Sequence, residues 1–130
     1  MTKQILCDAD FFVALLLDED TNFEKAKAIL DNNLDCVFLY SNLTRYELMT
    51  VLSRKLPQIK AVEALELFQN TFTDEFEFDT TLDSKIIEFY KNSENKNQSY
   101  FDIACFFTAQ KLNCKIASFD KFYPTAILIS

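Results

Sequence analysis

The stretch that decides the fold is Ile5-Leu6-Cys7-Asp8-Ala9-Asp10, an apolar run that ends in two acids. Its first three residues predict a buried strand, and the apolar stretch that follows, Phe11 to Leu17, predicts a helix. A second continuous apolar run, Cys36 to Tyr40, has the length of a buried parallel strand. The chain therefore opens with strands and helices in alternation, which is typical of an α/β protein.

The rest of the chain continues this alternation. We expect helices from a capping box at Thr21-Asn22-Phe23-Glu24 to about Leu30, from Ser41 or Asn42 to about Leu56, from Pro57 through Phe72, from Leu82 to Tyr90, and from Tyr100 to Leu112. Short strands are expected at Glu75 to Phe78, Lys115 to Ser118 and Ala126 to Ile129. The pattern predicts one domain over residues 1–130 of the α/β class, a three-layer α/β/α sandwich with a central, mainly parallel sheet.

Composition narrows the chemistry that this chain can perform. It has no histidine, so imidazole cannot serve as a general base or as a zinc ligand. It has no glycine either, which removes the Gly-rich phosphate loops of nucleotide-binding proteins. The cysteines show no zinc-ligand spacing, so we expect reduced thiols at Cys7, Cys36, Cys105 and Cys114. Any hydrolysis must then use carboxylates, hydroxyls, lysines or a metal.

Charge and hydrophobicity bear on partners and location. With 13 basic and 20 acidic residues the net charge is −7, which argues against strong general binding to nucleic acid and leaves room only for local contacts with RNA. No apolar run is long enough to span a bilayer, and no signal-type segment opens the chain. We therefore expect a cytoplasmic protein without a membrane partner.

Four carboxylates stand where a solvated acid is not expected. Asp8 and Asp120 follow predicted strands, at the edge where open α/β sheets bind ligands. Glu47 and Asp102 lie on the apolar faces of their predicted helices. A carboxylate removed from water needs a cation or hydrogen bonds, and sites made only of oxygen ligands favour Mg²⁺ or Mn²⁺. Together the acids predict one shared metal site.

Each acid also has a purely structural interpretation. Thr44 to Glu47 and Ser99 to Asp102 both fit the S/T-x-x-D/E capping pattern, in which the acid satisfies the start of its helix. Asp8 fits a turn after a strand, and Asp120 fits a loop. These alternatives stay open for each residue, and only the combination of the acids favours the metal site.

In this order the motifs resemble those of the PIN-domain family, which includes the VapC-like ribonuclease toxins of bacterial toxin–antitoxin pairs. The opening stretch 5–10 looks like that family's first strand and aspartate, and Leu43 to Leu48 is similar to its helix with one inward glutamate. Tyr100 to Ala104 and Ile116 to Tyr123 look like its paired C-terminal motifs. The resemblance covers nearly the whole chain.

The resemblance implies a set of site residues. The catalytic residues would bind the metal directly or through water, and they are Asp8, Glu47, Asp102 and Asp120. The Ser118 hydroxyl would lie beside this site. The family often has another acid at the position of Phe122 and a Thr, Ser or Asn at that of Asp10. Asp10 therefore either supplies the missing negative charge or caps the helix that follows, and the number of bound cations, one or two, stays open.

The implied activity is hydrolysis of RNA phosphodiesters with Mg²⁺ or Mn²⁺, leaving a 5′-phosphate and a 3′-hydroxyl. The protein would be a toxin that forms a homodimer and binds an antitoxin across the hairpin of residues 59–72 or near the acidic pocket. The basic residues nearest to the motifs either contact RNA phosphate or are ordinary surface charges: Arg45, Arg54 and Lys121.

Two other functions agree with parts of the sequence. Asp8-Ala9-Asp10 matches the DxD motif of aspartyl-phosphate phosphatases, with Asp8 as nucleophile and Asp10 as general acid. The glycine that usually follows that motif is absent, and Glu47 would have no task. A PIN-like module that binds a protein without cutting RNA would also suit the negative charge and the 14 phenylalanines.

Overall fold

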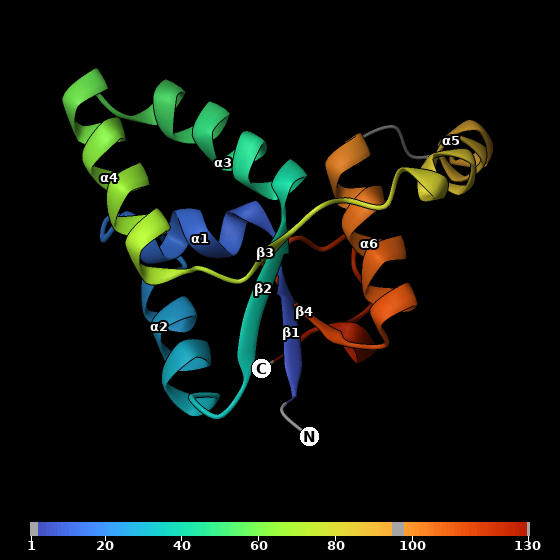
Figure 1. The fold of residues 1–130 in the computed structure, drawn as a ribbon, viewed down its shortest axis with the longest axis horizontal. Coiled ribbons are helices and arrows are strands. Elements are labelled where there is room, and N and C mark those ends of the chain that lie inside the picture. Colours follow the sequence, from blue (N-terminus) through green and yellow to red (C-terminus); the bar gives the residue numbers. More distant parts are fainter. Residues whose placement is uncertain (1–2, 95–97, 130) are drawn as a thin grey trace.

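A parallel sheet lies at the centre of the computed structural model, which describes residues 3–94 and 98–129. Within this part of the chain the sheet has four strands in the order β3-β2-β1-β4 (Figure 1). They are β1 (Gln4–Cys7), β2 (Val37–Ser41), β3 (Glu75–Phe76) and β4 (Lys115–Ala117). Ile5 of β1 pairs with Phe38, and Leu6 pairs with Ile116 on the other side. Because the strands are parallel, their carboxyl ends meet at one edge.

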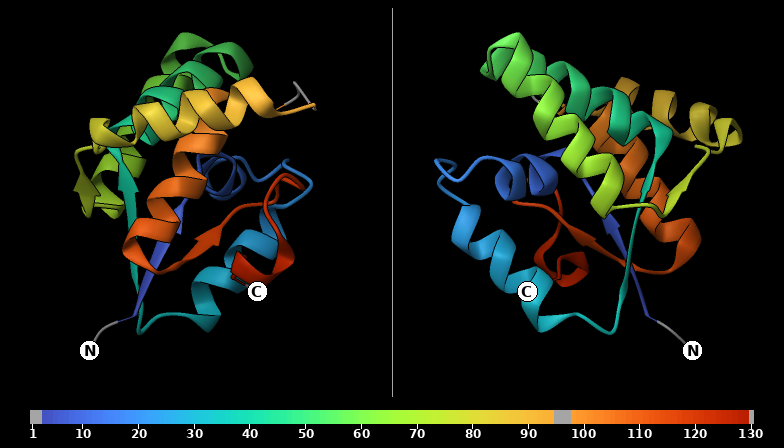
Figure 2. Two further views of the ribbon diagram at one scale, coloured as in Figure 1. Left: turned by 90° about the vertical axis from the view of Figure 1, so that its right-hand side faces the viewer. Right: turned by 60° about the vertical axis from the view of Figure 1, so that its left-hand side comes forward.

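Helices cover both faces of this sheet. One face carries α1 (Ala9–Leu16), α2 (Phe23–Asn32), α3 (Asn42–Lys55) and α4 (Gln58–Thr71). The other carries α5 (Asp83–Asn92) and α6 (Tyr100–Leu112). Figures 1 and 2 show the sheet between the two helical layers. The predicted three-layer α/β/α fold with a parallel sheet is thus confirmed.

An aromatic core fixes the larger helical layer on the sheet. The ring of Phe12 in α1 lies 4.8 Å from those of Phe68 and Phe72 and 5.3 Å from that of Tyr40 in β2, between ring centroids. Phe12 and Phe68 are fully buried, and the Tyr40 hydroxyl donates to the Phe72 carbonyl oxygen at 2.9 Å. Aromatic burial of this kind is a major contribution to core stability. It holds α1 and the end of α4 against β2.

The predicted capping box at Thr21 does not form. α2 begins at Phe23, and its N-cap Asn22 makes no side-chain capping hydrogen bond. Instead the Asn22 amide donates to Asp20 Oδ1 at 2.8 Å, so the chain turns just before the helix. A local turn of this type competes with capping for the same backbone amides.

The predicted strand at 126–129 is also wrong. The segment contains a short 3₁₀ turn, η2 (Thr125–Ile127), and then one isolated parallel bridge between Leu128 and Ile116. Pro124 precedes the turn and has no amide to give to a sheet ladder. The chain therefore reaches the sheet edge only briefly.

Two simpler expectations concern the thiols and the membrane. All four cysteines are free in the structure, with Cys7 and Cys105 buried. No helix in residues 3–94 or 98–129 combines the length and the apolar character needed to cross a bilayer.

Candidate metal centre

Acidic side chains from five elements gather at the carboxyl edge of the sheet. Asp8 directly follows β1, and Asp10 lies in the first turn of α1. Asp120 follows β4, Glu47 comes from α3, and Asp102 comes from the first turn of α6. Because α3 contacts both α1 and α6, the helices that carry these acids meet above the strands (Figure 1).

Asp8 is almost completely buried, with 4% of its surface exposed. Its Oδ1 accepts from the Ala9 amide at 2.8 Å, which caps α1, and its Oδ2 accepts from the Tyr123 hydroxyl at 2.7 Å. Burial, and then the nearby Asp10 and Glu47 carboxylates, raise the pKa of Asp8 well above its usual value, although the Tyr123 hydrogen bond opposes the rise. Asp8 is therefore both a structural cap and a member of the acidic group.

Asp10 is held from one side only. Its Oδ2 accepts from the Ser118 hydroxyl at 3.1 Å and from the Phe119 amide at 2.9 Å. Its Oδ1 is buried and has no hydrogen-bond partner among the described residues. Burial raises the pKa of Asp10 to about 6. The Phe119 amide, the Ser118 hydroxyl and the Phe11 amide oppose this rise, and the Asp120 carboxylate adds to it. Since Asp8 caps α1, the suggestion that Asp10 is the cap is wrong.

Glu47 is the other acid with an orphaned oxygen. Its Oε1 is buried, and no partner for it exists in the described part of the chain. Burial, then Asp102, Asp10 and Asp120, raise the pKa of Glu47 to about 7. Because α3 already begins at Asn42, Glu47 lies inside the helix, and the alternative of a Thr44–Glu47 capping box is wrong.

Asp102 and Asp120 are both tied to nearby backbone. Asp102 forms a capping box: its Oδ2 accepts from the Ser99 amide at 3.0 Å, and the Ser99 hydroxyl accepts from the Asp102 amide at 3.2 Å. Burial still raises the pKa of Asp102, which the Ser99 amide opposes and Asp120 increases. Asp120 Oδ1 accepts from the Phe122 amide at 2.9 Å, and its own amide donates to the Ser118 hydroxyl at 3.1 Å.

This group of acids suits a hard divalent cation. Its donors are all oxygens, and two of them, Asp10 Oδ1 and Glu47 Oε1, are buried without a hydrogen-bond donor in the described chain. Within residues 3–94 and 98–129 no three acidic or cysteine side chains form a ready-made coordination group. Mg²⁺ retains several waters and is commonly bound through one or two carboxylates, so a site with two orphaned oxygens and further acids acting through water fits it.

The sequence of the chain matches a family model for the PIN domain over residues 5–124. The chain belongs to the PIN domain family. The matched stretch contains all five acids described above. Among curated proteins, none matches the chain significantly.

Solved structures share the fold of this PIN domain. VapC20 from Mycobacterium tuberculosis, described as a sarcin-ricin loop cleaving toxin, aligns with TM-score 0.77 and 22% identity over 89% of each chain. VapBC2 from Rickettsia felis, solved with a DNA fragment from its promoter, aligns with TM-score 0.67 and 15% identity over 97% of this chain and 96% of that chain. FitAcB from Neisseria gonorrhoeae aligns with TM-score 0.68 and 21% identity over 89% of this chain and 87% of that chain. At such identities the likeness shows the fold alone.

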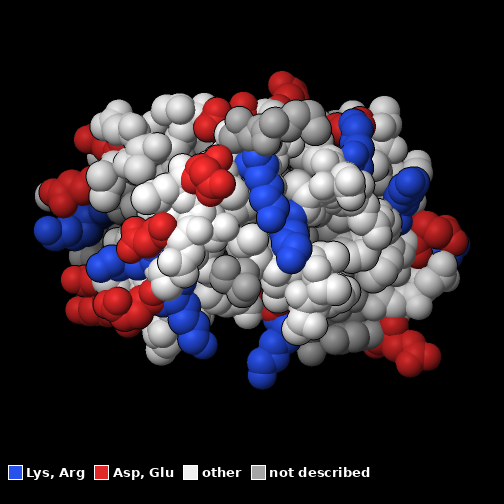
Figure 3. Space-filling model, turned by 90° about the horizontal axis from the view of Figure 1, so that it is seen from below, with Lys and Arg blue, Asp and Glu red and all other residues white. Residues whose placement is uncertain are grey.

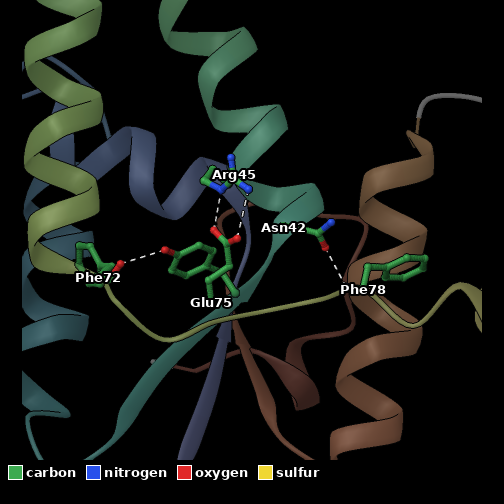
Figure 4. Close-up of polar contacts among 6 residues, drawn as sticks. Asn42, Arg45, Phe72, Glu75 and Phe78 are labelled. Carbon is green, nitrogen blue, oxygen red and sulfur yellow. Dashed lines mark hydrogen bonds and ion pairs between the residues drawn. The ribbon is translucent and has the colours of Figure 1, made fainter.

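The PIN domain places its predicted phosphate-contacting residues differently. The Arg45 guanidinium is paired with Glu75, through bonds of 2.6 and 3.2 Å (Figure 4), and also lies over the Tyr46 ring at 4.7 Å. Arg54 and Lys121 are exposed, and no salt bridge is found for either within the described chain. Arg45 would have to leave Glu75 to bind a phosphate, whereas the other two are accessible.

Charge on the opposite end of the PIN domain is mixed. Figure 3 shows the face at which the strands begin, where basic side chains form separate groups among acidic and uncharged ones. Among the residues described there, no continuous basic band is visible.

Sequence reasoning missed Tyr123. This residue is 2% exposed, and its hydroxyl donates to Asp8 Oδ2 and also lies 3.2 Å from the Asp102 carbonyl oxygen. A tyrosine between Phe122 and Pro124 was the available signal, because a buried tyrosine hydroxyl usually has a polar partner. Phe122 beside it packs on Phe89 and Phe106 and belongs to the core.

Proposed function

We propose that this PIN domain is a divalent-metal-dependent endoribonuclease, acting as a single domain and as the toxin of a type II toxin–antitoxin pair in the cytoplasm. The observation that carries the proposal is the group of five carboxylates at the carboxyl edge of the sheet, two of which have buried oxygens without a hydrogen-bond donor in the described chain. Buried carboxylates of this kind are costly unless a cation compensates them.

In this proposal the cation is held by Asp8, Glu47, Asp102 and Asp120, with Asp10 and Ser118 beside them. A bound Mg²⁺ or Mn²⁺ lowers the pKa of a coordinated water and stabilises charge on the attacked phosphate. The chain contributes the fixed arrangement of the acids: Asp8 is held by Ala9 and Tyr123, and Asp102 by Ser99. A nuclease of this type needs no histidine, which agrees with the composition.

The toxin assignment draws on the description of VapC20 as a sarcin-ricin loop cleaving toxin and on the surface of this chain. The α3–α4 hairpin exposes large apolar side chains, with Ile59 74% and Leu67 58% exposed. Surfaces of this character are typical of protein contacts. We propose that an antitoxin or the second subunit of a homodimer covers this hairpin.

The DxD phosphatase alternative is disfavoured by the geometry of Asp8. Both of its carboxylate oxygens already accept hydrogen bonds, and only 4% of the residue is exposed. A nucleophilic aspartate needs an accessible oxygen aimed at its substrate. Asp10, the supposed general acid, is bound to Ser118 and Phe119.

The test is cleavage of a mixed RNA pool by the purified protein with Mg²⁺ or Mn²⁺, beside an EDTA control. Asp102→Asn keeps an oxygen that can accept from Ser99 but removes the charge, and we expect it to cleave about tenfold more slowly. The matched control is Asp31→Asn at the exposed end of α2, which should cleave like the wild type.

Undiminished cleavage by Asp102→Asn, or cleavage that persists in EDTA, would contradict the metal mechanism. Absence of cleavage by the wild type with either metal would favour the protein-binding module instead. Release of phosphate from a phosphomonoester, lost in Asp8→Asn, would support the phosphatase.

A further inference from the structure

Asp10 has a carboxylate in which one oxygen is fully engaged and the other has nothing to bind. Ser118 and Phe119, more than a hundred positions away along the chain, both donate to Oδ2. These two bonds fix the orientation of the carboxylate, and they leave Oδ1 buried without a donor in the described chain. An acid on the surface would not need two hydrogen bonds from such distant residues to hold its carboxylate in place.

Glu47 presents a matching orphaned oxygen from α3, which packs against α1. The remaining acids differ, because none of them has a buried oxygen without a hydrogen-bond partner in the described chain. Asp8 has both oxygens bonded, Asp102 closes the capping box with Ser99, and Asp120 accepts from Phe122. Among the described residues, the buried side-chain oxygens that lack any donor lie on Asp10 and Glu47.

In the described part of the chain, no salt bridge involves Asp10 or Glu47. The salt bridges of the described chain involve Arg45, Lys60 and Lys111, and their acidic partners lie elsewhere, at Glu75, Glu63 and Asp79. A divalent cation would satisfy both orphaned oxygens, and one or two carboxylates with retained waters suffice to hold Mg²⁺.

We infer that Asp10, together with Glu47, is a primary anchor of the cation, and that Ser118 is a positioning residue that holds Asp10 toward it. This inference rests on the metal site of the proposed function, but not on the identity of the substrate.

The test is direct binding of Mn²⁺ to the purified full chain. Binding is measured by calorimetry and by the loss of the free-ion signal in electron paramagnetic resonance. We expect Asp10→Asn and Glu47→Gln each to weaken Mn²⁺ binding by about 100-fold, and Ser118→Ala by about tenfold. Ser118→Thr retains the hydroxyl and should restore binding. Asp31→Asn and Glu66→Gln, on exposed helix faces, serve as matched controls and should bind as the wild type does.

Folding is checked by thermal melting without metal. Removing a buried charge should leave Asp10→Asn and Glu47→Gln at least as stable as the wild type in EDTA, so weaker binding would not reflect unfolding. Wild-type affinity in Asp10→Asn, or equal weakening by Ser118→Ala and Ser118→Thr, would overturn the inference.

The same samples separate this inference from the proposed function. A wild type that binds Mn²⁺ through Asp10 but does not cut RNA would contradict the ribonuclease and support the anchor. A wild type that cuts RNA, with Asp10→Asn binding Mn²⁺ normally, would support the ribonuclease and contradict the anchor.

Discussion

Helices α3 and α6 both bring an acid to the site, but their first turns are held in different ways. α6 is capped locally, because Ser99 and Asp102 exchange hydrogen bonds within one turn. The N-cap of α3, Ser41, makes no side-chain capping bond. That helix is instead held by distant residues: Asn42 Oδ1 accepts from the Phe78 amide at 2.7 Å, and Arg45 pairs with Glu75 (Figure 4).

This difference decides what each carboxylate can do. Asp102 has a structural partner whether or not a cation is present. Glu47 lies further along its helix and has a buried oxygen without a partner in the described chain. An acid that already caps a helix contributes to folding stability, whereas an acid that has no donor is available to a ligand.

The largest expected effect is on RNA cleavage. Glu47→Gln should slow metal-dependent cleavage by about 100-fold or more, and Asp102→Asn by about tenfold, because Glu47 has a buried oxygen without a partner in the described chain whereas Asp102 is engaged in a capping box. Rates are measured at saturating Mn²⁺, with Glu66→Gln as the control. A larger loss of cleavage rate in Asp102→Asn than in Glu47→Gln would contradict this difference between the two acids.

The next effect is the pH dependence of stability without metal. The pKa of Glu47 is raised to about 7 in the fold, so the folded state holds this proton more tightly than the unfolded chain does. This contribution is fully present below the ordinary glutamate pKa and is lost as the pH rises through about 7. The melting temperature in EDTA should therefore fall between pH 5.5 and 8.5.

Glu47→Gln should flatten that fall by a few degrees, and Asp102→Asn should flatten it less because the Ser99 amide stabilises the Asp102 carboxylate. Profiles that coincide for Glu47→Gln and the wild type would show that Glu47 does not titrate in this range.

The local cap should account for about 1 kcal/mol of stability. Ser99→Ala removes the hydroxyl that accepts from the Asp102 amide, which should lower the free energy of unfolding by about 1 kcal/mol. Ser41→Ala is the same change at the uncapped helix and should cost less. Urea denaturation in EDTA measures both. Equal costs would mean that the capping box adds nothing.

The smallest effect concerns the ion pair that holds α3 to β3. Arg45 and Glu75 have side chains 25% and 29% exposed, and pairs with such access to water contribute little. Glu75→Gln should lower the free energy of unfolding by less than about 1 kcal/mol, as measured by urea denaturation. A loss well above that value would show that the start of α3 depends on this pair more than on Asn42.

The fold could be predicted where apolar runs were long and had a clear start. The predicted helix from Tyr100 to Leu112 agrees with α6 at both ends, since a strongly apolar segment follows a serine that caps it. The prediction failed at 126–129, because an apolar segment of four residues does not show whether a sheet edge is free to receive it. Only Leu128 makes the bridge.

The site could be predicted only in part. The carboxyl ends of parallel strands bring Asp8 and Asp120 to one edge, and this follows from sequence alone. The same S/T-x-x-D/E pattern at Glu47 and Asp102 gave no means of telling a cap from an orphaned acid, because that depends on where each helix begins. The roles of the acids as metal ligands stay predictions.

The hydrogen bonds that organise Asp8 and Asp10 also set when the site is complete during protein synthesis. Their donors, Tyr123 and Ser118, leave the ribosome 115 and 108 residues later. At roughly 5–20 residues per second, that interval lasts about 5–23 s. During it, β1 lacks β4 as a neighbour, and both aspartates lack these donors. A chain that stops before residue 118 therefore carries the first acids of the site without the contacts that arrange them.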